Sequence, residues 1–167
     1  MLGLNWGASV SERSASLPCD ELVPGARTRC DRALSVDAPA AVLFRWLCQL
    51  RVAPYSYDLF DNLGRRSPRT LTPGAEQLEV GARFMRIFSL RSFKPDEQLT
   101  LRAPAVAVTY AVHPRGADRS RLVARVVFTA SGGRLGDALV GRVLALGDLV
   151  MMRKQLLTLK ELAERSV

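Results

Sequence analysis

Residues of the types that carry out proton transfer gather in one short segment, between Tyr55 and Asn62. This segment contains a second tyrosine, Tyr57, followed directly by Asp58, and then Asp61. A hydroxyl beside a carboxylate can orient a carbonyl group or move a proton as a general acid or base. The same pair can instead hydrogen-bond the chain where it turns, since a buried tyrosine ring usually brings its hydroxyl to a partner. Tyr57 and Asp58 are therefore weak candidate catalytic residues, and the structural role is the favoured alternative.

Arg86 is a candidate for binding an anion. It lies between Phe84 and Phe88 in a stretch of alternating apolar and polar residues, so a strand would turn all three side chains to one face. An arginine on an inward face needs a carboxylate partner or an anionic ligand. A bulge that turns Arg86 out to water is the slightly favoured alternative.

The histidine and cysteine content excludes several kinds of site. His113 is the only histidine, and nothing in the sequence places a nucleophile beside it, so a Ser-His or Cys-His arrangement is not indicated. The spacings of Cys19, Cys30 and Cys48 match neither a disulfide framework nor a zinc site. We expect three reduced thiols, with Cys48 as a buried residue of a helix. The sequence predicts no metal and no cofactor.

Length and composition predict one globular domain. The chain has 167 residues, of which 48% are hydrophobic and 24% are charged. The longest stretch without a charge, residues 103–114, is too short for a membrane-spanning helix, which needs about 20 apolar residues. Residues 1–25 lack the basic start and apolar centre of a secretory signal. We therefore expect a cytoplasmic protein.

The net charge of +8 raises the question of nucleic-acid binding, because arginines neutralise phosphates. The arginines are spread along the chain from Arg13 to Arg165, and the densest cluster is only Arg65, Arg66 and Arg69. This distribution argues against a nucleic-acid partner. A basic face that meets an acidic protein or a membrane surface is a lower-ranked alternative.

The first half of the chain predicts an arm, a strand and a helix. Residues 1–25 are rich in glycine, proline and serine, which disfavours regular structure, although Trp6 is expected to dock on the body of the protein. A strand is expected over 27–36. A helix with Asp37 as its N-cap should follow and end before Pro54, and residues 55–62 should add one or two helical turns.

Beyond residue 81 the apolar pattern changes to a period of two. It predicts four strands, at 83–93, 98–102, 106–113 and 120–130. Short connections leave no room for crossover helices, so the sheet should be antiparallel, with one packed face and one wetted face. Residues 134–165 return to helical spacing and predict a long last helix, with a bend or break near Gly141 and Gly147.

This order of elements is a helix-grip arrangement. Three segments also resemble bacterial members of the SRPBCC superfamily, the START-like proteins, a group that includes polyketide cyclases. The three segments are residues 50–62, the pair Trp6-Gly7 followed by 20–24, and residues 35–39. The resemblance implies an arm at 1–25 and an α+β helix-grip domain at 26–167, with a curved antiparallel sheet wrapped around the long C-terminal helix. It also implies an apolar cavity between sheet and helix.

The expected function is the binding or carriage of a hydrophobic small molecule such as a lipid or polyketide. A curved sheet facing a long helix independently predicts a concave apolar pocket, the usual shape of a small-molecule site. The alternatives are a cyclase or dehydratase that uses Tyr57 and Asp58, and a partner-binding module with a basic face. Plain core packing is the more common role for each residue expected to line the cavity. These residues are Tyr55, Tyr57, Phe84, Arg86, Phe88, Tyr110, Leu122, Val126, Phe128, Leu139, Val143, Leu146 and Val150.

Overall fold

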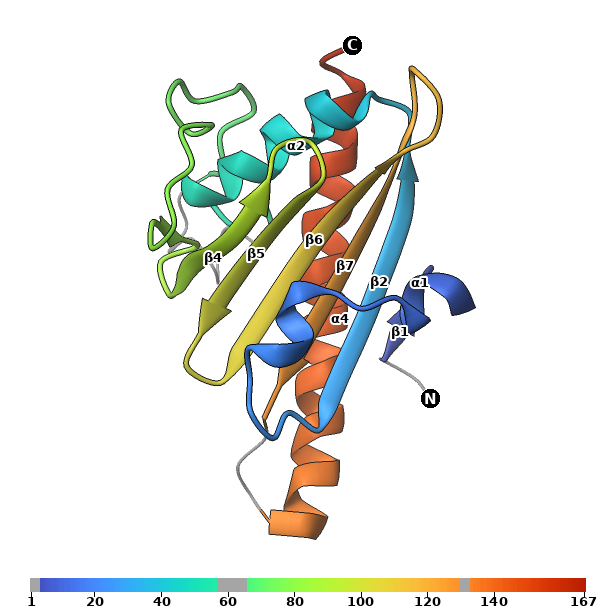
Figure 1. The fold of residues 1–167 in the computed structure, drawn as a ribbon, viewed down its shortest axis with the longest axis vertical. Coiled ribbons are helices and arrows are strands. Elements are labelled where there is room, and N and C mark those ends of the chain that lie inside the picture. The colour runs from blue at the N-terminus through green and yellow to red at the C-terminus, as the bar shows by residue number, and fades with distance from the viewer. Residues whose placement is uncertain (1–3, 57–65, 130–132) are drawn as a thin grey trace.

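A curved sheet wraps one side of a long C-terminal helix (Figure 1). The computed structural model describes residues 4–56, 66–129 and 133–167, and the side chains of 133–146 and 148 are not described. The described strands lie in one sheet of order β1-β2-β7-β6-β5-β4-β3. The strands are β1 (Asn5–Trp6), β2 (Thr28–Val36), β3 (Arg83–Phe84), β4 (Phe88–Lys94), β5 (Gln98–Ala103), β6 (Val106–Pro114) and β7 (Ser120–Phe128). The helices are α1 (Val10–Ser14), α2 (Ala40–Cys48) and α4 (Gly133–Glu164), with 3-10 turns η1 (Pro18–Glu21) and η2 (Gln49–Arg51).

This architecture is the helix-grip α+β fold that the sequence predicts. The neighbouring strands from β3 to β7 and the pair β2–β7 are antiparallel, as expected from their short connections. The exception is β1, which runs parallel to β2 with Asn5 opposite Asp31. The arm is therefore more regular than predicted, because its first residues add a strand to the edge of the sheet. Trp6 packs partly buried against the core, with the Arg153 guanidinium 5.5 Å from its ring centre, so its expected docking is confirmed.

Two details of the helices differ from the prediction. Asp37 is not the N-cap of α2, because β2 is followed by a bend at Asp37 and the extended Pro39 takes the N-cap position, so the helix begins only after it. Asp37 instead pairs with exposed Arg119, Oδ1 to Nε at 3.1 Å, and its backbone N–H donates to Glu164. The expected break near Gly141 and Gly147 is also wrong, because α4 continues unbroken from Gly133 to Glu164. No helix among the described residues has the length and apolarity to cross a membrane.

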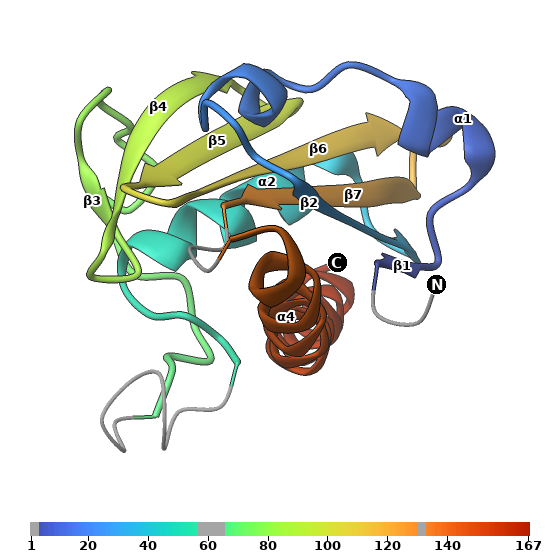
Figure 2. The ribbon, with the colours of Figure 1, turned by 90° about the horizontal axis from the view of Figure 1, so that it is seen from below.

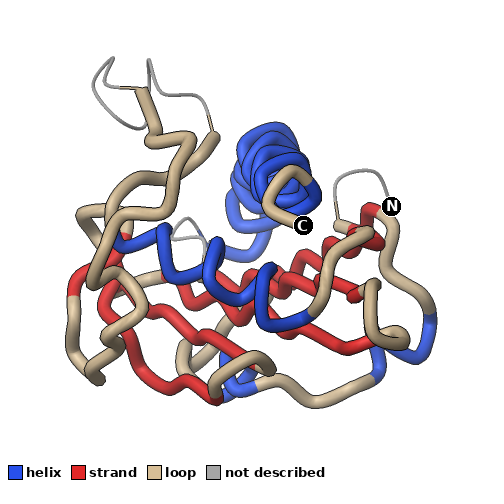
Figure 3. Tube along the Cα trace, turned by 90° about the horizontal axis from the view of Figure 1, so that it is seen from above, coloured by secondary structure: helices blue, strands red, loops and turns tan. Residues whose placement is uncertain are grey.

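The main core lies on the inner face of the sheet. Helices α2 and α4 both cover this face, and Figure 3 shows them on the same side of the strands. On α2 the period of three and four residues buries Leu43, Trp46 and Leu47, as the sequence predicts. The last turns of α4 close the same core with Leu156, Leu159 and Leu162.

Along β7 the outer face of the sheet is buried, not wetted as predicted for this strand. The N-terminal arm crosses it, on the side opposite α4 (Figure 2). Ala8 packs against Val123 of β7, and Cys19 packs against Val127 of the same strand. Both faces of β7 are therefore covered. The three cysteines are free and buried, which confirms the prediction of reduced thiols.

Candidate ligand-binding site

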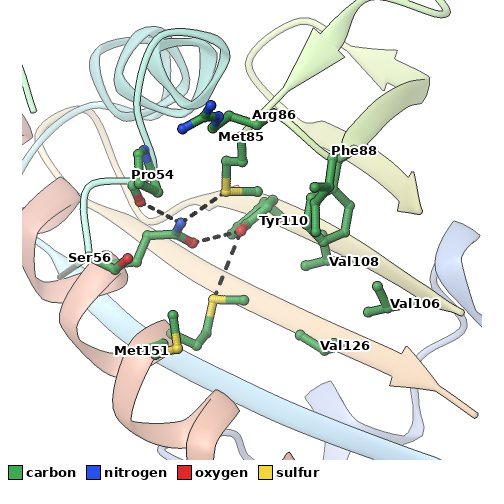
Figure 4. A pocket seen from close by; sticks show the side chains of 13 residues that line it. Pro54, Ser56, Met85, Arg86, Phe88, Val106, Val108, Tyr110, Val126 and Met151 are labelled. Atoms are coloured by element: carbon green, nitrogen blue, oxygen red, sulfur yellow. Dashed lines mark hydrogen bonds between the residues drawn. The ribbon is translucent and has the colours of Figure 1, made fainter. Parts of the chain in front are cut away.

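A pocket of about 390 Å³ lies between the inner face of the sheet and α4 (Figure 4). Strands β6 and β7 form one wall, α4 forms another, and the chain after α2 and the turn between β3 and β4 close the sides. Most of the lining is apolar, and small-molecule sites typically have volumes of about 300–1,000 Å³. The lining residues are Pro54, Ser56, Met85, Arg86, Ile87, Phe88, Val106, Val108, Tyr110, Val126, Met151, Met152 and Gln155.

A tight turn over residues 85–87 interrupts the strand that the sequence predicts at 83–93. Phe84 pairs with Phe88, and the Ile87 N–H donates to the Met85 carbonyl at 2.8 Å. Met85 and Arg86 both have left-handed backbone conformations, with φ of 41° and 67°. The Met85 N–H donates to the Leu50 carbonyl at 3.0 Å, which fastens the turn to the segment after α2.

This turn separates three side chains that a continuous strand would place on one face. Phe84 is buried in the core, whereas Phe88 is half-buried in the pocket wall. Arg86 is exposed and lies at the rim of the pocket. The expectation of a shared face is therefore wrong. The exposure of Arg86 agrees with the alternative in which it turns to water, although a turn rather than a bulge causes it.

A buried chain of hydrogen bonds crosses the pocket wall. The Tyr110 hydroxyl donates to Oε1 of Gln155 at 2.6 Å and approaches the Met152 sulfur at 3.9 Å. The Gln155 amide nitrogen donates to the Pro54 carbonyl at 2.6 Å and lies 3.3 Å from the Met85 sulfur. Gln155 is only 5% exposed. Burying its amide without hydrogen bonds would destabilise the folded protein, and these bonds prevent that loss. They also join α4 to β6 and to the 85–87 turn.

Gln155 is the site residue that sequence reasoning missed most clearly. It lies between Met152 and Leu159 at helical spacing, on the buried stripe of α4. A polar residue inside an apolar stripe usually has a hydrogen-bond partner from another element. This was the available signal. Pro54, Met85, Val108, Met151 and Met152 were not expected in the lining either.

The residues predicted to line the cavity fall into three groups. Arg86, Phe88, Tyr110 and Val126 line the pocket. Tyr55 and Val150 lie outside the lining. The Tyr55 ring packs edge-on against Trp46, with 6.2 Å between the ring centres, and Val150 is exposed. Whether any of them contacts a ligand remains a prediction. The remaining buried residues outside the lining are Phe84, Leu122 and Phe128. The predicted positions whose side chains are not described are Tyr57, Leu139, Val143 and Leu146, and the candidate catalytic residue Asp58 is not described either.

The described lining contains one charged side chain, Arg86. His113 is exposed at the end of β6 and does not belong to this lining. Burial raises the pKa of the Cys48 thiol to about 12, so this thiol stays protonated and unreactive near neutral pH. No group of potential metal ligands occurs among the residues whose structure is described.

Comparison with known proteins identifies the fold. No protein-family model and no curated protein matches the chain, but solved structures do. The KanY protein aligns with a TM-score of 0.51 and 14% identity over 84% of this chain and 99% of its own. A START superfamily protein from Mycobacterium smegmatis aligns with a TM-score of 0.48 and 11% identity over 83% of this chain and 99% of its own.

The di-domain ARO/CYC protein BexL has a TM-score of 0.49 and 17% identity over 81% of this chain. The chain spans about half of BexL, 46% of its length. At 14% identity, the alignment with KanY establishes similarity of fold and nothing about activity. With its curved sheet around one long C-terminal helix, the chain has the helix-grip α+β fold, which is the fold that its resemblance to the START-like, or SRPBCC, proteins implies.

Proposed function

We propose that the protein binds or carries a hydrophobic small molecule in the pocket between the sheet and α4. The observation that carries this proposal is the largely apolar lining around a space of about 390 Å³. Transfer of apolar ligand surface from water into such a pocket is favourable by about 25 cal/mol per Å². Tyr110 and Gln155 add a few fixed polar groups, and sites for small molecules commonly combine the two.

Binding is favoured over catalysis by the chemistry of the described lining. Its ionisable side chains are Arg86 and Tyr110, and the Tyr110 hydroxyl already donates to Gln155. General acid–base catalysis needs a group poised to exchange a proton with the substrate. A cyclase or dehydratase activity would depend on Tyr57 and Asp58, which lie outside the described residues, and it remains a prediction.

Binding of the neutral fluorescent dye Nile red tests the proposal. Val106 lies half-buried in the pocket wall, so Val106→Trp should fill the pocket and weaken binding at least about tenfold, the effect of losing ~1.4 kcal/mol. Val80→Trp is the matched control, because Val80 is 61% exposed and outside the lining. Circular dichroism and melting temperature establish that both variants are folded. Equal affinity of wild type and folded Val106→Trp would place dye binding elsewhere and overturn the proposal.

A further inference from the structure

The two ends of the pocket differ in polarity. Figure 4 shows Arg86, Pro54 and Ser56 on one side and Val106 and Val126 on the other. The buried Gln155 amide, which bonds the Pro54 carbonyl at 2.6 Å, belongs to the polar side. A pocket of this kind suits a molecule with a polar head and an apolar body, because each part then meets surroundings of its own kind.

Arg86 is held at the polar rim by an unfavourable backbone conformation. Its φ of 67° lies in the left-handed region, which glycine and asparagine adopt more readily than a residue with a long side chain. The Met85–Ile87 hydrogen bond and the pairing of Phe84 with Phe88 hold the turn on both sides of it. Unfavourable conformations of this kind are concentrated at functional sites. The turn therefore keeps an arginine beside the pocket where glycine would be the residue of least strain.

The charge of Arg86 is not neutralised by the surrounding residues that the structure describes. It forms no ion pair with them. Residues 81–95 also carry Arg83, Arg91 and Lys94, and they contain no aspartate or glutamate. The turn between β3 and β4 therefore leaves the positive charge of Arg86 at the rim of the pocket, and such a charge favours an anionic ligand.

We propose that the ligand is a hydrophobic carboxylate. Its carboxylate pairs with the Arg86 guanidinium at the rim, and its apolar body lies against Val106, Val108 and Val126. The planar guanidinium suits a carboxylate because it can donate two parallel hydrogen bonds. This inference rests on the proposed function and names the class of molecule that the same pocket takes. Because Arg86 is exposed, solvent screens the pair, and the expected preference for the acid is about fivefold.

A pair of probes that differ only in charge tests the proposal. Parinaric acid and its methyl ester share one fluorescent chain, and only the acid is ionised at about pH 8. Wild-type protein should bind the acid about fivefold more tightly than the ester, and added salt should reduce this preference. Arg86→Gln should weaken binding of the acid more than binding of the ester and so remove the preference. Arg83 is also exposed and belongs to the same hairpin but not to the lining, so Arg83→Gln should keep the preference.

The outcomes separate this inference from the proposed function. If the ester binds and Val106→Trp abolishes its binding, while wild type shows no preference for the acid, only the carboxylate assignment is overturned. The carboxylate assignment alone is also overturned if Arg86→Gln keeps the full preference for the acid, or if Arg83→Gln loses as much of this preference as Arg86→Gln does. If neither probe binds to wild type, both the assignment and the proposed function fail.

Discussion

Arg125 of β7 and Asp31 of β2 lie directly opposite each other, and Nε of Arg125 is 2.7 Å from Oδ1 of Asp31. The Arg125 side chain is 0% exposed. Its remaining N–H groups donate to Asp20 at 2.7 Å and to the backbone carbonyls of residues 12, 13 and 15. All of these other acceptors belong to the N-terminal arm. One buried guanidinium therefore fastens the arm to the outer face of the sheet.

Replacing this guanidinium should destabilise the protein strongly. Arg125→Met should lower the free energy of unfolding by about 3–5 kcal/mol, because Asp20 loses its cation and Asp31 keeps only half-exposed Arg29, while the arm carbonyls lose their buried donors. Arg119→Met is the control, since Arg119 and Asp37 pair at an exposed site and the loss should be within about 1 kcal/mol. Urea denaturation measures both. Similar small losses in the two variants would contradict the role given to Arg125.

The ion pair between Glu12 and Arg121 should make stability depend on pH. The hydrogen bonds from Arg121, at 2.7 and 3.0 Å, lower the pKa of the Glu12 carboxyl from 4.5 to about 2. A carboxyl with a lowered pKa stabilises the folded state above its unfolded pKa, and this contribution is lost as pH falls toward the folded pKa. Wild type should therefore exceed Glu12→Gln in stability by a constant margin above about pH 6, and the margin should shrink between about pH 5 and pH 2.

Urea denaturation of both proteins across this range provides the measurement. The difference between the two curves isolates Glu12, because other titrating groups, such as Glu164 with its lowered pKa, are common to both. A margin that stayed the same from neutral pH down to about pH 3 would show that the ionised carboxylate contributes nothing.

Gly7 should be far less tolerant of alanine than Gly116. Both glycines have left-handed φ, 74° and 86°, so alanine strains the backbone at each by about 1–2 kcal/mol. A Cβ at position 7 would also collide with the Ala33 carbonyl of β2, whereas a Cβ at position 116 meets nothing within 4 Å. Gly7→Ala should therefore lower the melting temperature clearly more than Gly116→Ala. Equal shifts in thermal unfolding would mean that the arm moves away from β2 without cost.

The strands and helices were largely predictable because hydrophobic period is a local property. The strands β2, β5, β6 and β7 and the long α4 lie within one or two residues of the predicted ranges. The 85–87 turn was not predictable, because Met85 and Arg86 give no glycine or asparagine signal for their left-handed conformations. The burial of Arg125 escaped prediction for a different reason. Arg121 and Arg125 alternate with apolar residues, a pattern that predicts a solvent-exposed face. Arg125 is buried because the N-terminal arm, which is distant in sequence, covers it.

The site was predictable in part. Alternation along a strand fixes which face a side chain takes, so Tyr110 and Val126 were assigned to the inner face and lie in the pocket wall. Leu122 and Phe128 share that face with Val126, yet neither lines the pocket. Their distance from the cavity depends on where α4 crosses the sheet, which is set by packing between distant segments and not by the local sequence.

The position of α4 at the C-terminal end has a consequence for biosynthesis. The inner face of the sheet is sealed by residues as late as Leu162 and Ala163, and the Trp46 ring nitrogen donates to Ser166 at 3.0 Å. At rates of about 5–20 residues per second, the strands emerge from the ribosome before the helix that covers them, and synthesis of these 167 residues takes on the order of 10–30 s. The nascent sheet thus presents its apolar face to chaperones and to other chains until α4 has also been synthesised. A message truncated before α4 would yield an aggregating fragment rather than a smaller domain.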